Sequence, residues 1–196
     1  MFERLVDTLK AELARPRQVG AVQPGPLVPA AVLILVYPRD GEPHILFTKR
    51  TDSVEYHKGE VSFPGGAWEP GDADLTATAL RETWEELGVS PEDVTILGDM
   101  GDSVTGTGFV IRSVVGTIRE GYAFKPSVAE IDSVIEVPLR VLMDPAHRRS
   151  ETRWVDGEPV ESWSFVHGRH LIWGATAGIV RRLVEILEKS DWRAED

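Results

Sequence analysis

Apolar residues at helical spacing mark both ends of the chain. Near the N-terminus they recur every three or four residues until Pro16, which predicts a helix over 2–15. This stripe consists of Leu5, Val6, Leu9 and Leu13. Between Thr176 and Leu187 a second stripe follows the i, i+3, i+4, i+7 rule, with charged residues off the stripe. It predicts an amphipathic helix over 175–189.

Runs rich in Val and Ile, bounded by turn residues, predict strands between these helices. Residues 30–37 are apolar, the turn formers Pro38, Asp40, Gly41 and Pro43 follow, and 44–50 resume strand character. We expect a hairpin or two neighbouring strands there. Further strands are expected at 60–63, 94–100, 109–118, 134–137, 153–155, 162–166 and 170–173.

A third helix is expected in the middle of the chain, over 72–87, after a Gly/Pro-rich loop at 63–71. Helices before, within and after a series of strands predict an α/β (α+β) sandwich in which helices cover a mixed sheet. We find no repeat and no low-complexity linker, so residues 1–196 are expected to form a single domain.

Composition excludes several classes of function. The chain has 196 residues and no cysteine, so a disulfide framework, a thiolate nucleophile and a Cys-ligated zinc site are excluded, and the cytoplasm is the default compartment. No apolar run is long enough for a membrane span or a signal peptide. A net charge of −11 argues against binding to nucleic-acid backbones. An anionic substrate would need cations recruited locally.

The central helix places three carboxylates close together. Glu82, Glu85 and Glu86 lie within one arc, and the apolar face is expected to consist of Thr76, Ala77, Leu80, Thr83, Trp84 and Leu87. A solvated acidic face is one interpretation. However, like charges at these spacings repel, and the C-terminal end of a helix dipole disfavours anions. A hard divalent cation such as Mg²⁺, which takes oxygen ligands, would relieve this repulsion.

Two glycines precede this helix and a third ends it. Gly65 and Gly66 follow the strand expected at 60–63, where they would let the backbone approach a ligand closely, although an ordinary loop is the alternative. Gly88 is suited to a left-handed C-cap. A glycine pair followed along the chain by a helix that carries three carboxylates indicates a metal site beside a cradle for phosphate.

These residues resemble the box of the Nudix hydrolase family, G-x5-E-x7-R-E-U-x-E-E-x-G-U. The match runs from Gly66 to Val89 and includes Arg81, Glu82, Glu85, Glu86 and Gly88. Two departures occur. Asp72 takes the place of the first Glu with eight residues, not seven, before Arg81, and Thr83 replaces an aliphatic residue.

The extra residue and the Asp are similar to the coenzyme A pyrophosphatase branch of that family. Its upstream pattern is matched by 46–51 and 57–66, and Ile172 to Gly178 is similar to a C-terminal segment of the branch. Glu69 differs from the Asp of the branch pattern. The resemblance implies a Nudix α/β/α sandwich with the box as loop-helix-loop, and hydrolysis of coenzyme A and its derivatives to 3′,5′-ADP and 4′-phosphopantetheine.

The resemblance also implies the roles of individual residues. Glu82, Glu85 and Glu86 are expected to bind Mg²⁺ or Mn²⁺, which activates water and neutralises the diphosphate. Arg81 is expected to orient carboxylates, being at i, i+4 from Glu85. Glu130, outside the box, is the candidate general base, with an ordinary exposed loop Glu as the alternative.

Further residues are candidates for substrate binding. Lys49, Arg50 and Lys58 form the basic cluster nearest the box and could meet the extra phosphate of the substrate, or could simply be solvated. His57 would contact substrate or be hydrogen-bonded within its loop. Gly65 and Gly66 would approach the phosphates. Trp68 would stack on a base or fill the loop.

Two other functions are compatible with the sequence. The first is a Nudix hydrolase acting on ADP-ribose, a dinucleotide or a nucleoside triphosphate, and the second is a non-catalytic nucleotide-binding regulator. The complete set of Glu82, Glu85 and Glu86 argues against the regulator, since a sensor does not need a repulsive acidic patch. A small-molecule substrate is the expected partner. The oligomeric state stays open, with a homodimer as one option.

Overall fold

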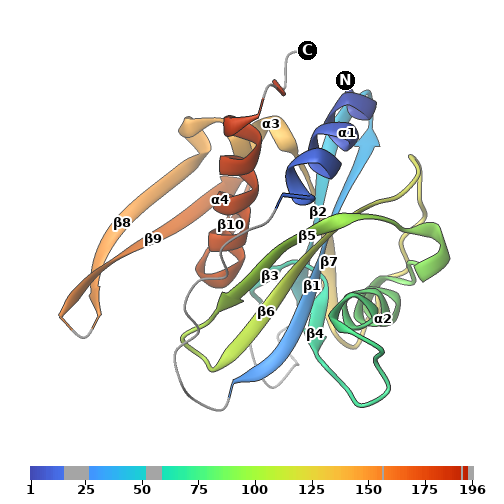
Figure 1. Ribbon diagram of the computed structural model, residues 1–196, viewed down its shortest axis with the longest axis horizontal. Coiled ribbons are helices and arrows are strands. Elements are labelled where there is room, and N and C mark those ends of the chain that lie inside the picture. The colour runs from blue at the N-terminus through green and yellow to red at the C-terminus, as the bar shows by residue number, and fades with distance from the viewer. Residues whose placement is uncertain (16–26, 52–58, 156, 191, 194–196) are drawn as a thin grey trace.

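The computed structural model describes residues 1–15, 27–51, 59–155, 157–190 and 192–193. Two sheets and four helices make up this part of the chain (Figure 1). The larger sheet contains β1 (Val28–Arg39), β2 (Glu42–Arg50), β3 (Val61–Ser62), β4 (Gly65–Ala67), β5 (Thr95–Val104), β6 (Phe109–Thr117) and β7 (Ile131–Pro138). The smaller sheet contains β8 (Arg148–Val155), β9 (Glu158–His167) and β10 (His170–Ile172).

The helices are α1 (Phe2–Leu13), α2 (Leu75–Leu87), α3 (Leu139–Met143) and α4 (Gly174–Lys189), and two 3₁₀ turns, η1 (Pro91–Asp93) and η2 (Pro145–His147), link other elements. The larger sheet is mixed. Its order is β3-β2-β1-β6-β5, with β4 paired to β1 and β7 paired to β2. β1 runs parallel to β6, whereas its pairings with β2 and β4 are antiparallel.

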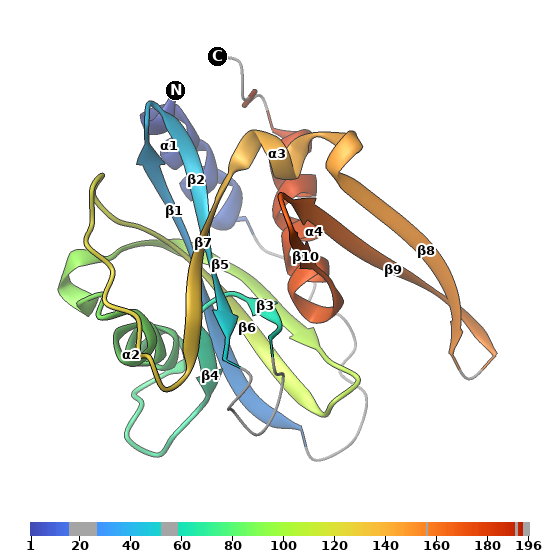
Figure 2. The same cartoon turned by 180° about the vertical axis from the view of Figure 1, so that it is seen from behind.

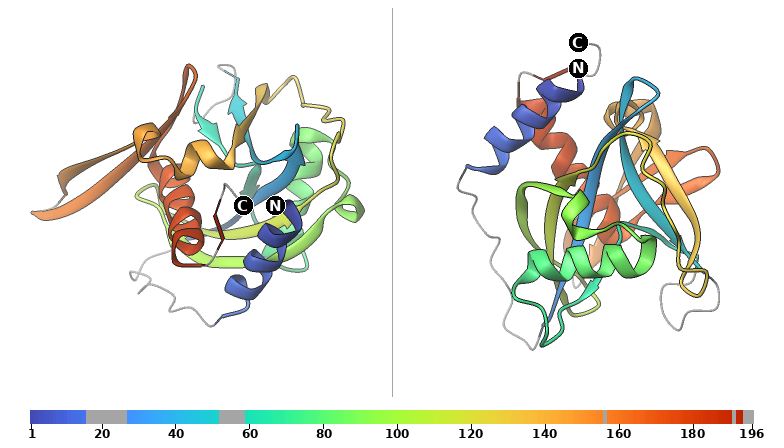
Figure 3. Two further views of the ribbon diagram at one scale, coloured as in Figure 1. Left: turned by 90° about the horizontal axis from the view of Figure 1, so that it is seen from above. Right: turned by 90° about the vertical axis from the view of Figure 1, so that its right-hand side faces the viewer.

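Helices cover both faces of this sheet, as the views from behind and from the side show (Figures 2 and 3). On one face α2 packs on β1, in a core that includes Leu33, Leu46 and Ala79. On the other face α1 and α4 enclose a second core with Ile34 and Phe47. Alternation along the strands sends neighbouring residues to opposite cores. The expected α/β/α sandwich around a mixed sheet is confirmed.

The helices expected at both ends of the chain are present as α1 and α4, and the expected hairpin is formed by β1 and β2. Two local predictions are wrong, and one short helix was missed. The segment 63–71 was expected to be a loop but contains β4, α3 was not expected, and β8 begins at Arg148, well before 153. β4 escapes pattern analysis because glycine has low strand propensity. No described helix has the length and apolarity needed to cross a bilayer.

The rotation of α2 also differs from the prediction. Trp84, expected on the apolar face, is 52% exposed, whereas Ala79, Thr83 and Glu86 are buried. The buried face is therefore turned by about one residue step, or 100°, toward the carboxylates. Apolar periodicity could not locate this face, because one of the residues that it buries is a glutamate.

Candidate active site

The ends of α2 are fixed by its own sequence and by a distant loop. Asp74 caps the N-terminus, its side chain accepting a hydrogen bond from the Ala77 amide at 2.8 Å. Gly88 ends the helix in the left-handed conformation, at φ 66°. Beyond it, the amides of Lys125 and Ser127 donate to the carbonyls of Leu87 and Glu86, each at 2.8 Å. The C-terminal turn of α2 thus anchors the segment that leads to Glu130.

The two glycines of β4 bring the backbone against the carboxylates of α2. Gly65 has φ 154°, and a Cβ there would lie 2.3 Å from the carbonyl oxygen of Ala31 on β1. A Cβ on Gly66 would lie 2.4 Å from Oε1 of Glu82. Glycine is therefore required at Gly65, where a side chain would meet the backbone of β1, whereas at Gly66 it allows close approach to a site carboxylate.

Glu86 is the most deeply buried of the three carboxylates, at 2% exposure. Its Oε1 accepts from Nη1 of Arg50 at 3.3 Å, and the backbone of Gly65 also donates to this carboxylate. Its Oε2 is buried without a hydrogen-bond partner. Burial raises the pKa of Glu86 to about 8, against the opposing effect of Arg50. A buried, partly unsatisfied carboxylate of this kind calls for a cation.

Glu82 and Glu85 line the outer part of the same helix face, with side chains 18% and 51% exposed. Burial also raises the pKa of Glu82, while its hydrogen bond from Arg81 acts in the other direction. The carboxylates of Glu82 and Glu130 both raise the pKa of Glu86 by charge repulsion. The side chains of Glu82 and Glu130 are therefore close enough to Glu86 for their charges to act on it.

Arg81 holds this arrangement together. Its Nε and Nη2 donate to the two carboxylate oxygens of Asp72, at 2.9 and 3.1 Å, and its Nη1 donates to Glu82 at 3.0 Å and Glu85 at 3.1 Å. Nη2 also donates to the carbonyl of Ala67 on β4, at 3.1 Å. Since its donors are directed to these protein acceptors, Arg81 is placed to orient carboxylates and to tie α2 to β4.

Asp72 is engaged within the protein. Besides the bidentate pair with Arg81, its Oδ2 accepts from the Glu69 amide at 3.0 Å and from the Thr78 hydroxyl at 2.9 Å. The hydrogen bonds from Arg81 hold the pKa of Asp72 well below its usual range. The residue that replaces the first Glu of the box thus anchors Arg81, a role that sequence reasoning missed although the substitution itself pointed to this position.

Arg50 links the carboxylates of α2 to Glu130. Its Nη2 lies 4.0 Å from Oε2 of Glu130, while Nη1 donates to Glu86. The Thr51 amide also donates to the Glu130 carbonyl at 2.8 Å, which fixes this loop to the end of β2. The Glu130 side chain is 47% exposed. The structure therefore brings together Arg50, Glu130 and the box carboxylates, which are far apart in the sequence.

The chemistry of this donor set fits a hard divalent cation. In the described part of the chain, no group of three or more His, Asp or Glu side chains already converges in metal-binding geometry. The fit rests instead on the orphaned Oε2 of Glu86, on the neighbouring carboxylate of Glu82, and on oxygen being the only donor type presented. Soft metals, which prefer sulfur ligands, are disfavoured.

Comparison with known proteins assigns this site to a family. Residues 27–156 match the NUDIX domain. The chain belongs to the Nudix family. Its relatives include proteins named uncharacterized Nudix hydrolase NudL, from Citrobacter koseri, 37% identical over 79% of this chain and 80% of the relative, and from Cronobacter sakazakii, 38% identical over 82% and 83%.

Solved Nudix structures share the fold at low sequence identity. The NUDIX domain of Shewanella oneidensis NrtR, solved as a complex with ADP ribose, has a TM-score of 0.52 at 19% identity and covers 90% of this chain and 97% of that one. A MutT/nudix family protein from Enterococcus faecalis has a TM-score of 0.54 at 15% identity, covering 96% and 70%. At such identities the likeness establishes the Nudix fold alone.

Lys49 and Arg50, expected to belong to one basic cluster near the Nudix box, contact different carboxylates, and their role in substrate binding stays a prediction. Lys49 donates to Asp132 at 3.0 Å, away from the box carboxylates that Arg50 contacts. The pairing of β2 with β7 is irregular between Lys49 and Arg50, so simple strand alternation does not describe where these two side chains go. His57 and Lys58 lie outside the described residues. Trp68, 41% exposed, donates its ring N–H to the Asp72 carbonyl at 3.2 Å.

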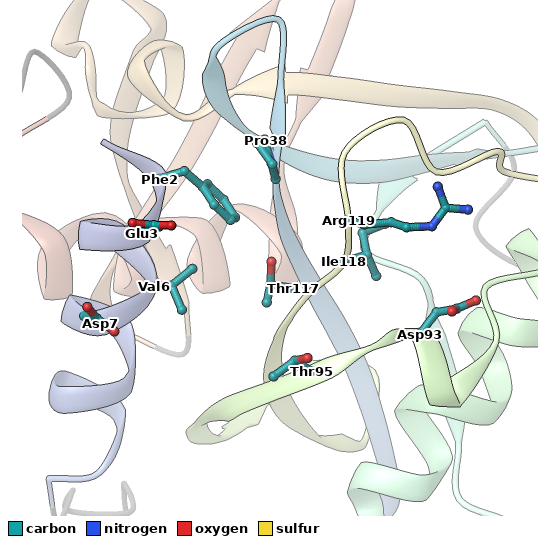
Figure 4. Close-up of a pocket in the computed structure, with 10 residues that line it drawn as sticks. All are labelled: Phe2, Glu3, Val6, Asp7, Pro38, Asp93, Thr95, Thr117, Ile118 and Arg119. Carbon is teal, nitrogen blue, oxygen red and sulfur yellow. The ribbon is translucent and has the colours of Figure 1, made fainter.

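A cavity of about 620 Å³ lies apart from the Nudix box (Figure 4). It opens between α1, the β1–β2 turn and the segment that follows β6, and its lining includes Phe2, Val6, Pro38 and Ile118. None of the box carboxylates lines it. This cavity is therefore not part of the candidate active site.

Proposed function

We propose that this Nudix protein hydrolyses the diphosphate linkage of coenzyme A and its derivatives, giving 3′,5′-ADP and 4′-phosphopantetheine. The hydrolytic part of the proposal rests on one observation above all, the buried and unpartnered Oε2 of Glu86 beside Glu82 and the glycines of β4. The choice of coenzyme A rests on the branch motifs at 46–51, 57–66 and 172–178.

Glu82, Glu85 and Glu86 would hold Mg²⁺ or Mn²⁺. Such a metal, when bound, neutralises the diphosphate oxygens and lowers the pKa of a coordinated water. Arg81 keeps Glu82 and Glu85 in place through its Nη1, and Asp72 keeps Arg81 in place. This support matters because a displacement of about 1 Å at a catalytic group can cost 10²-fold in rate.

Glu130 is the candidate for the general base that takes the proton of the attacking water. Its carboxylate is close to the charges of Glu86 and Glu82, and Arg50 lies between it and Glu86. A half-exposed side chain is accessible to substrate water, which a buried carboxylate is not. Arg50 would restrain Glu130 and at the same time offset part of the repulsion among the three carboxylates.

The test is a substrate panel with product identification. Coenzyme A, acetyl-coenzyme A, dephospho-coenzyme A, ADP-ribose and a dinucleoside polyphosphate are incubated with Mg²⁺ or Mn²⁺, and products are identified by mass. We expect 3′,5′-ADP from coenzyme A, with ¹⁸O from labelled water on one phosphate only. Turnover of ADP-ribose equal to or faster than that of coenzyme A contradicts the substrate assignment but leaves a Nudix hydrolase. Binding without turnover of any compound favours the regulator.

The 3′-phosphate distinguishes coenzyme A from dephospho-coenzyme A. One charge-assisted contact is worth about 1.5–3 kcal/mol, so kcat/KM for dephospho-coenzyme A should be lower by roughly 10- to 150-fold. Since Arg50 is paired with Glu86 and Glu130, and Lys49 with Asp132, the proposed contact falls to Lys58 among these three residues. A charge reversal at the responsible lysine should remove the preference while sparing the slower substrate. Equal rates for both substrates before any mutation contradict the contact.

A further inference from the structure

The β8–β9 hairpin projects from the body of the molecule as an arm, visible from both sides in Figures 1 and 2. At its base the arm is held by β10, which pairs with Phe165–His167 of β9, and by α4, whose Arg181 stacks over the Trp163 ring at 4.6 Å. The β8–β9 ladder then continues outward as far as the pair Val155 and Glu158. A two-stranded ribbon without further support is only marginally stable in water.

The two edges of this arm differ in how well they are protected against pairing with another strand. Along β9, the outer edge beyond β10 carries Pro159, which lacks an amide hydrogen and so blocks strand addition. Along β8, no proline occurs, and within the described residues the strand pairs only with β9. Ser150, Thr152 and Trp154 are exposed on this strand. Among the described strands, none pairs with the β8 edge, and no proline protects it as Pro159 protects the β9 edge.

The outer part of the arm also exposes a large apolar side chain. Trp154 is 73% exposed, the most exposed tryptophan among the described residues. It lies opposite Pro159 and, by strand alternation, on the same face as Ser150, which lies opposite Trp163. Tryptophan is enriched among the residues that carry most of the binding energy at interfaces, so Trp154 beside the β8 edge is suited to anchor a partner strand.

We propose that two copies of this chain associate through their β8 edges, pairing antiparallel about a two-fold axis at Thr152. The two three-stranded sheets would then form one continuous sheet, with the open backbone groups of each β8 satisfied by the other copy. This proposal is independent of the substrate and of the metal.

Charge and size favour this register over those centred on Glu151 and Ser150. In a two-fold antiparallel pair with the axis normal to the sheet, opposite residues share a face, so some residue must lie opposite its own copy, with the axis midway between the two. An axis at Glu151 sets that carboxylate against Glu151 of the partner subunit, which is unfavourable. An axis at Ser150 leaves Trp154 beyond the partner strand. An axis at Thr152 sets Trp154 opposite Ser150 of the partner subunit, so that a large side chain covers a small one.

The chain contains no cysteine, so a single introduced cysteine reports the register directly. In the variant Thr152→Cys the two sulfurs would face each other, because opposite Cα atoms in an antiparallel pair lie about 4.5–5.5 Å apart, within the range that a disulfide spans. Ser150→Cys is the matched control. In the same register its two copies are four residues apart along the strands, about 13 Å, which a disulfide does not span.

We expect mild oxidation to convert Thr152→Cys into a covalent dimer that dithiothreitol reverses, and to leave Ser150→Cys largely uncrosslinked. Light scattering and sedimentation of the unmodified full chain should give a dimer. A monomer at all concentrations from about 1 to 100 µM overturns the proposal. Equal crosslinking of the two variants, or faster crosslinking of Ser150→Cys, overturns the register and with it the assigned interface.

A second pair of variants tests the interface without cysteine. Trp154→Lys should raise the dimer dissociation constant by about 30-fold or more, as expected for a buried tryptophan anchor. Trp84→Lys, which changes an exposed tryptophan on α2, should leave it unchanged. Circular dichroism establishes that both variants fold. A folded Trp154→Lys protein with unchanged dimer affinity contradicts the β8 interface.

Discussion

The Glu86 carboxylate is buried with one oxygen unsatisfied, an arrangement that costs folding free energy unless a cation shares the site. Glu86→Gln keeps the shape and removes the charge. We predict that kcat/KM for the preferred diphosphate substrate falls by about 10²–10⁴-fold, as when an electrostatic catalytic group is lost. In chelator, the melting temperature of the Glu86→Gln variant should not be lower than that of the unmodified protein, because the glutamine side chain carries no charge into the buried site. If the Glu86→Gln variant melts at a lower temperature than the unmodified protein in chelator, the role of Glu86 is mainly structural.

Glu130→Gln separates the candidate base from the metal site. If Glu130 accepts the proton of the attacking water, this change should lower kcat by about 10²–10⁴-fold across the pH profile with little effect on metal affinity. The measurement pairs rate-against-pH curves with metal titrations followed by melting temperature. A Glu130→Gln rate close to that of the unmodified enzyme, alongside an inactive Glu86→Gln, would place the base within the Nudix box.

Asp72 contributes to stability through its ion pair with Arg81. Because its folded-state pKa is depressed, this contribution is present above the ordinary value of 3.8 and is lost as pH falls toward the folded-state pKa. Asp72→Asn should therefore lower the free energy of unfolding most at pH 7. The gap between the two proteins should narrow below about pH 4 in urea titrations. A gap that is constant from pH 7 to pH 3 would exclude this electrostatic origin.

At the scale of elements, the short strand β4 carries two glycines with different constraints. Gly65→Ala introduces a Cβ against backbone atoms of Ala31 and Val32 at an unfavourable φ, so we predict destabilisation by at least about 1–3 kcal/mol. Gly66→Ala meets only the flexible end of Glu82. It should fold with nearly normal stability while kcat/KM drops by about 10-fold or more. Equal loss of stability in both variants, measured by urea unfolding, would contradict this division.

The same elements show what sequence patterns could and could not provide. Helix α2, its Gly88 cap and the Arg81–Glu85 contact follow from local spacing, and all three are present. The rotation of α2 does not follow, because periodicity assigns burial to apolar residues and Glu86 breaks that rule. The contact of Arg50 with Glu86 and Glu130 depends on strand pairing between β2 and β7, which lies beyond any local pattern.

At the scale of the whole molecule, a chain of net charge −11 must process an anionic substrate. A divalent metal held at the proposed site would resolve this conflict locally, and because it would bind the folded site alone, it should also stabilise the fold. At 100 times its dissociation constant, one bound ion adds about 2.7 kcal/mol, which for a chain of this size corresponds to a rise of roughly 5–10 °C in melting temperature.

The measurement compares Mg²⁺ and Mn²⁺ with NaCl at matched ionic strength, because general screening of a highly charged protein also affects stability. We expect the divalent ions alone to give the large shift, excess chelator to reverse it together with activity, and Glu86→Gln to reduce it. A shift of equal size in NaCl would mean screening of the net charge. Full activity in excess chelator would remove the metal from the mechanism and leave the carboxylates of α2 without their proposed role.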